Sequence, residues 1–118
     1  MTTVALLMAA GTAVTSAYAG DATVVLELVA VKFKAGVNAA DHDQAGKAVA
    51  AMIAKQAGFI SRETVSGPNG EWFAIVHWAT TKDAENAAAI FMKSPEGQAS
   101  MAQADPNSVL FKHYVAAK

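Results

Sequence analysis

The chain contains no cysteine and little charge. Without cysteine it has no disulfides, thiolate metal ligands or cysteine nucleophiles. This absence is compatible with any cellular compartment. Only 16% of the 118 residues are charged, the net charge is −1, and no basic run occurs, which argues against nucleic-acid binding. By contrast, 53% of the residues are hydrophobic. A chain of this length suits one domain, and so apolar a small domain is expected to hide surface by association.

The first nineteen residues also lack any charged side chain. An apolar run over 4–14 has the length of a signal-peptide hydrophobic region, and Ala17-Tyr18-Ala19 supplies small residues before a cut at Gly20. Because no Lys or Arg precedes the run, an extra helix packed on the domain is the alternative. The run is shorter than the ~20 residues that span a bilayer, so no membrane association is expected after processing. We therefore predict a signal peptide over 1–19 and a domain over 20–118, periplasmic or secreted if the signal is real and cytoplasmic otherwise.

The domain sequence alternates between strand and helix patterns. Runs rich in Val, Ile and aromatic residues predict strands over 23–33, 59–65, 71–78 and 108–115. Capping residues predict helix starts at Asn38, Thr80 and Ser94, and turn residues at 66–70 predict a hairpin. The order β-α-β-β-α-β predicts an α+β, ferredoxin-like antiparallel sheet with strand order 4-1-3-2 and both main helices on one face.

The third strand is apolar on both of its faces. Trp72, Ala74, Val76 and Trp78 alternate with Phe73, Ile75 and His77. Helices can cover one face of the sheet, so a ligand or a second subunit must cover the other. The sequence does not determine whether Trp78 or His77 points toward that open face.

The aromatic third strand continues into Thr-Lys-Asp-Ala, a helix, Ser94-Pro95 and a final strand bearing Phe and Tyr. With the element order and the Gly58-Phe59 step, this pattern resembles the dimeric α+β barrel superfamily, specifically its antibiotic-biosynthesis-monooxygenase-like domains, over about residues 22–116. The resemblance implies a homodimer through the open sheet face, which becomes the interior of a barrel. Some members are cofactor-independent oxygenases of phenols, others act at heme, and others have no demonstrated chemistry. The first-strand Asn and second-helix His of heme degraders are missing here, so no cofactor is predicted.

Two of the three histidines are candidate bases. His77 and His113 lie on strands expected to flank the first strand, whose polar member is Glu27. A carboxylate between two imidazoles could tune one near neutral pH as a general base. The alternatives are a polar patch at the dimer interface and strand ends in water.

The third histidine, His42, lies between Asp41 and Asp43 at a helix start. Adjacent helix residues point in different directions, so a solvated helix start is expected there. No spacing typical of a metal site occurs, and no metal is predicted.

Aromatic residues are candidates to line a pocket for a flat ligand, together with Glu27. They are Trp72, Phe73, Trp78, Phe91, Phe111 and Tyr114. Core and interface packing is the alternative. Arg62, the only arginine, either forms an exposed charge with Glu63, which we favour, or holds an anionic substrate group.

Taken together, these features predict a protein that binds or oxidises a small aromatic or quinol-type compound in a dimeric barrel. The resemblance implies cofactor-independent monooxygenase chemistry, in which a histidine deprotonates a phenol in an apolar cavity. The alternatives are a non-catalytic small-molecule-binding or stress-associated module and a structural dimer with a filled interior. Substrate, pathway and turnover do not follow from the sequence.

Overall fold

The computed structural model describes residues 24–115, so the predicted signal peptide and its cleavage point lie outside the described part. The strands are β1 (Val25–Lys32), β2 (Phe59–Ser66), β3 (Glu71–Trp78) and β4 (Leu110–Val115), and the helices are α1 (Ala39–Ile53), α2 (Thr81–Lys93) and α3 (Pro95–Ala102). Short 3-10 turns, η2 (Pro68–Gly70) and η3 (Pro106–Ser108), precede β3 and β4. The predicted β-α-β-β-α-β order is confirmed. Within residues 24–115, no helix has the length and apolar character needed to cross a membrane.

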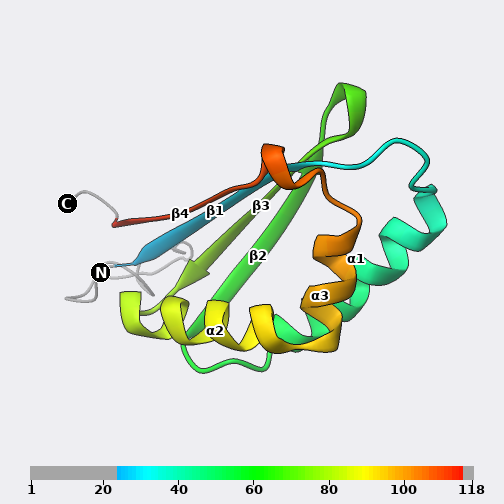
Figure 1. Ribbon diagram of the computed structural model, residues 1–118. Helices are drawn as coiled ribbons and strands as arrows, with labels where there is room; N and C mark the ends of the chain where they lie inside the picture. The colour runs from blue at the N-terminus through cyan, green and yellow to red at the C-terminus, as the bar shows by residue number, and fades with distance from the viewer. Residues whose placement is uncertain (1–23, 116–118) are drawn as a thin grey trace, which may run out of the picture.

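The four strands form one antiparallel sheet in the order β2-β3-β1-β4, as predicted. The three helices gather on one side of this sheet, and the described residues leave its other side uncovered (Figure 1). The fold is therefore ferredoxin-like, with a helix-covered face and an open face.

Side-chain caps fix where the helices begin. The Asn38 side chain accepts a hydrogen bond from the backbone N–H of Asp41 at 2.8 Å. Thr80 caps α2 in the same way, and Ser94 ends α2 and caps α3. These bonds satisfy N–H groups that the first turn of a helix leaves without partners.

The core lies between the sheet and the helices. Its centre is Trp78, which is 0% exposed and packs its ring edge-on against Phe59 at a centroid distance of 5.8 Å. Other members of this core are Val25, Val49, Ile53, Val76, Ala84 and Ala87. Because side chains alternate along a strand, Trp78 on the helix side places His77 on the open face.

The open face carries several exposed apolar side chains. Strand register places Val65, Phe73, Leu110 and Tyr114 on it, and each is at least 37% exposed. An apolar surface shared by several strands of a small domain is typical of an association surface.

Strand β2 carries one irregularity that affects the site. Phe59 pairs with Trp78, but the next pair along the ladder joins Ser61 to His77, so β2 contains an extra residue at this point. Such a bulge shifts the alternation of the strand by one position. Arg62 consequently lies opposite Val76, on the helix-covered side.

Candidate functional site

A cavity of about 220 Å³ lies between the sheet and the helices. Small side chains around it leave this space unfilled: Ala74 of the sheet, Ala87 and Ala88 of α2, and Ala104, which follows α3. Its volume is below the range of about 300–1,000 Å³ for drug-sized ligands, so a ligand of one or two rings suits it. Sequence reasoning placed a ligand space on the open face, between two paired sheets. The cavity lies instead on the helix-covered face of the sheet.

A row of four residues crosses the helix-covered side, one on each strand. Arg62 on β2 lies opposite Val76 on β3, and Val76 lies opposite Glu27 on β1. Glu27 in turn lies opposite His113 on β4. Arg62, Val76 and Glu27 all line the cavity. The row therefore presents a cation and a carboxyl group to an otherwise largely apolar space.

Glu27 and His113 form a close pair. The distance between Glu27 Oε1 and His113 Nε2 is 3.0 Å, and Glu27 is only 5% exposed. The ring of Phe111 packs edge-on against the His113 ring at a centroid distance of 5.5 Å. A buried carboxyl group needs such a partner, because its ionised form is costly away from water.

Burial raises the pKa of the Glu27 carboxyl above its usual value, because it disfavours the charged form. His113, the Trp78 indole N–H and Arg62 act in the opposite direction and offset part of this rise. The buried indole nitrogen makes no hydrogen bond of good geometry with any described residue, so His113 is the main polar partner of the carboxyl. The raised pKa makes Glu27 a stronger base than an exposed glutamate.

His77 does not join this pair. It lies opposite Leu26, whereas His113 lies opposite Glu27, so the two histidines occupy opposite faces of the sheet. On the open face, His77 Nδ1 lies 3.2 Å from the hydroxyl oxygen of Ser61. The expectation that both histidines share a face with Glu27 is therefore wrong.

Arg62 is half-buried at the other end of the row. Its guanidinium carbon lies 5.8 Å from the centre of the Trp72 ring, and burial lowers its pKa. Within residues 24–115 it has no carboxylate partner inside ion-pair distance. Glu63 points to the opposite face, so the favoured interpretation of Arg62 as an exposed partner of Glu63 is wrong. The bulge that turns Arg62 inward leaves no signal in the sequence.

The predicted aromatic residues divide into two groups. Trp72, Phe91 and Phe111 line the cavity, and Phe33, which sequence reasoning missed, lines it too. Trp78 is buried in the core and does not form part of the cavity wall. Phe73 and Tyr114 lie on the open face, with 37% and 46% of their surfaces exposed.

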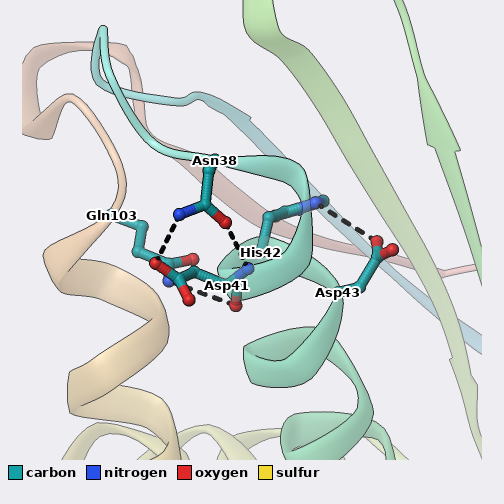
Figure 2. A network of polar contacts seen from close by, with 5 residues as sticks. All are labelled: Asn38, Asp41, His42, Asp43 and Gln103. Atoms are coloured by element: carbon teal, nitrogen blue, oxygen red, sulfur yellow. Dashed lines mark hydrogen bonds and ion pairs between the residues drawn. The ribbon is translucent and has the colours of Figure 1, made fainter.

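His42 belongs to a separate polar network at the start of α1 (Figure 2). Asn38 bonds Asp41 through both its amide oxygen and its amide nitrogen, and Gln103 donates to the Asp41 carbonyl oxygen at 3.4 Å. His42 Nδ1 lies 3.9 Å from Asp43, on the side away from Asp41 (Figure 2). No group of three or more His, Cys, Asp or Glu side chains in the described part of the chain could hold a metal ion together. The network joins α1 to the end of α3, and it is a capped helix start.

Comparison with known proteins gives matches to structures alone. No known family profile matches the sequence, and no curated protein matches it. The structure is similar to a mutant of SnoaB, a cofactor-independent oxygenase from Streptomyces nogalater, with a TM-score of 0.69 and 18% identity over 80% of this chain and 94% of SnoaB. It is also similar to a Bordetella bronchiseptica protein classed with the antibiotic biosynthesis monooxygenases, with a TM-score of 0.65 and 11% identity over 81% of this chain and 99% of that one.

A third similar structure is a dimeric ferredoxin-like protein of unknown function from Thermobifida fusca. Its TM-score is 0.59 at 8% identity, over 81% of this chain and 93% of the other. At such low identities these likenesses concern the fold, and at that level they confirm the predicted resemblance. Residues 24–115 have the ferredoxin-like fold of the antibiotic-biosynthesis-monooxygenase-like domains.

Proposed function

We propose that the cavity binds a small phenol or quinol and that Glu27, held by His113, is the base for its cofactor-independent oxidation. The observation that carries this proposal is the buried Glu27–His113 pair, 3.0 Å apart, in which Glu27 lines an apolar cavity. Burial raises the pKa of this carboxyl above its usual value, which makes it a stronger base than an exposed glutamate.

The two members of the pair have different parts in this proposal. Glu27 lines the cavity, so its carboxylate takes the proton from the ligand hydroxyl. His113 holds the carboxylate through Nε2 and stabilises it in both protonation states, since imidazole can donate or accept at that nitrogen. Glu27 is thus the proposed catalytic residue and His113 a positioning residue, which revises the sequence-based assignment of the base to a histidine.

The chemistry restricts the substrate further. In an oxidation without a bound reductant, the substrate itself must supply all the electrons that reduce O₂. A phenol that tautomerises to a ring CH₂ meets this requirement, because the CH₂ becomes C=O, one oxygen atom stays in the product and the other leaves as water. Removal of the phenolic proton makes the ring a better electron donor. SnoaB, which has a similar fold, is described as a cofactor-independent oxygenase, and this supports the same reaction class.

We also propose that two copies of the chain associate through the open sheet face. The face carries exposed apolar side chains, among them Phe73, Leu110 and Tyr114. Similar structures from Thermobifida fusca and Jannaschia are described as dimeric, which supports a homodimer for this chain. The cavity lies on the other face, so each subunit of such a dimer would carry its own site.

We further propose that residues 1–19 are a signal peptide, cut before Gly20 during export. The uncharged apolar run and the Ala-Tyr-Ala sequence support this. Mass spectrometry of exported protein should then show an N-terminus at Gly20, and an intact Met1 would contradict export by this route.

Oxygen uptake tests the proposed reaction. Wild type is assayed with 1-naphthol and hydroquinones beside Glu27→Gln and the matched variant His77→Gln, which changes an ionisable group on the opposite face. General-base catalysis accounts for about 10²–10⁴ in rate, so Glu27→Gln should lose turnover on that scale while His77→Gln stays within about twofold. Equal rates in wild type and Glu27→Gln would reject Glu27 as the base. Ligand binding without oxygen uptake in wild type would assign the cavity a binding function instead.

A further inference from the structure

The cavity wall carries one cation whose charge the described residues leave unpaired. Arg62 lines the cavity, and within residues 24–115 no carboxylate approaches it to ion-pair distance. Its charge and that of Glu27 influence each other, but the two side chains form no ion pair. A charge that is partly withdrawn from water without a partner is costly, so an anion entering the cavity would gain a favourable contact.

The aromatic neighbour of Arg62 leaves its hydrogen-bonding edge available. The guanidinium lies 5.8 Å from the Trp72 ring centre, an arrangement in which the cation is attracted to a ring face. A ring face offers no acceptor for the N–H groups. The planar fork of a guanidinium fits the two oxygens of a carboxylate, and this bidentate geometry is stronger than a contact to a neutral carbonyl.

The spacing of the row defines how a ligand would lie. Arg62 and Glu27 are separated by Val76, so their backbones lie two strand spacings apart, roughly 10 Å. Val76 is apolar and lines the cavity between them. A flat ring resting over Val76 could therefore direct one substituent to Glu27 and another, on its far side, to Arg62.

We propose that the cavity selects hydroxyaromatic carboxylic acids, with Arg62 binding the carboxylate and the Glu27–His113 pair facing the hydroxyl group. This inference rests on the proposed function, because it assumes that a hydroxyaromatic compound occupies the cavity. It adds a requirement that the base alone does not impose, namely a negative charge on the ligand opposite its hydroxyl. The small volume of the cavity favours acids of one or two rings over larger anions.

The test compares ligands that differ only in charge. 4-Hydroxybenzoate is paired with 4-hydroxybenzamide, and 6-hydroxy-2-naphthoate with its amide, because each amide keeps the shape of the acid and lacks its charge. Dissociation constants are measured by titration calorimetry for wild type, Arg62→Met, Arg62→Lys and the matched variant Lys47→Met, which removes a cation from the exposed surface of α1.

Wild type should bind at least one acid about tenfold or more tightly than its amide. In Arg62→Met this preference should disappear through weaker binding of the acid, with the affinity for the amide unchanged. Arg62→Lys should keep part of the preference, because an ammonium group keeps the charge but lacks the fork. Lys47→Met should behave as wild type.

The outcomes separate this inference from the proposed function. Equal affinity of wild type for acid and amide, or a preference that survives Arg62→Met, would overturn the role of Arg62 and leave the phenol site standing. The comparison of acid with amide in wild type needs no variant, so it decides even if Arg62→Met does not fold. If wild type binds none of the four compounds while the uncharged phenol 1-naphthol binds, the acid requirement is overturned. If nothing binds, the proposed function is overturned with it.

Discussion

The two faces of the sheet carry one histidine each, in contrasting surroundings. His113 lies on the helix-covered face, 3.0 Å from a carboxyl group that is almost fully buried. His77 lies on the open face beside the Ser61 hydroxyl, with no carboxylate in contact among the described residues. The same side chain thus has a buried carboxyl partner on one face and a neutral hydroxyl partner on the other. Residue type alone does not mark a functional histidine, because the face on which it lies decides its chemistry.

The two faces also differ in what their apolar residues do. On the covered face, Trp78 and Val76 pack against helices and next to the cavity. On the open face, Phe73 and Tyr114 remain exposed. The covered face therefore stabilises the fold and contains the candidate site, and the open face is available for association.

The largest effect should appear in the core. Trp78→Ala removes a fully buried ring and should lower the free energy of unfolding by about 3–5 kcal/mol. The neighbouring side chain, His77, points to the open face. His77→Ala should therefore lower the free energy of unfolding by less than about 1 kcal/mol. Urea unfolding of both variants at one protein concentration measures the difference. Similar losses of unfolding free energy in the two variants would show that the covered face contributes no more to stability than the open face.

A second variant tests the association face. Phe73→Glu would place like charges on the paired open faces and should weaken the dimer on the order of a hundredfold. The matched variant Ile90→Glu changes an equally apolar side chain, 46% exposed on α2, and should leave the dimer intact. Analytical ultracentrifugation over a concentration series distinguishes them. A wild type that sediments as a monomer, or a loss of the dimer in Ile90→Glu, would contradict association through the sheet.

The smallest effect concerns the pH dependence of stability. The pKa of Glu27 is higher in the folded chain than its usual value of 4.5, so the folded state holds this proton more tightly than the unfolded state. Its contribution to stability is thus fully present below pH 4.5 and is lost as the pH rises through the raised pKa. Relative to Glu27→Gln, wild type should lose stability over that interval, as followed by urea unfolding at a series of pH values. The exposed control Glu85→Gln should show the same pH dependence of stability as wild type. If the stability of wild type and of Glu27→Gln changed with pH in parallel, the pKa of Glu27 would not be raised in the folded state.

Much of the fold could be predicted from local sequence. Alternating apolar residues identified the strands, capping residues such as Asn38 and Thr80 identified the helix starts, and the element order gave the strand order. The face of the sheet on which each strand residue lies is harder to predict. Whether His77 or His113 lies beside Glu27 depends on the register between strands far apart in the chain, and no local pattern encodes it.

The cavity could not be predicted for a similar reason. It depends on small residues such as Ala74 and Ala87 that meet only after the helices pack on the sheet. Sequence reasoning instead assigned the ligand to the space between two sheets, because that face had no visible cover. The inward direction of Arg62 depends on the irregularity in β2, which the local sequence pattern does not reveal.

The bulge between Phe59 and Ser61 therefore has a consequence for how this site could change. Compared with a regularly paired strand, every side chain of β2 after the bulge lies on the opposite face of the sheet. Regular pairing of the same residues, without the bulge, would turn Arg62 outward and Glu63 inward, reversing the sign of the charge that faces the cavity. A change of strand pairing alone would thus exchange a cation for a carboxylate at the cavity, without any substitution in its wall.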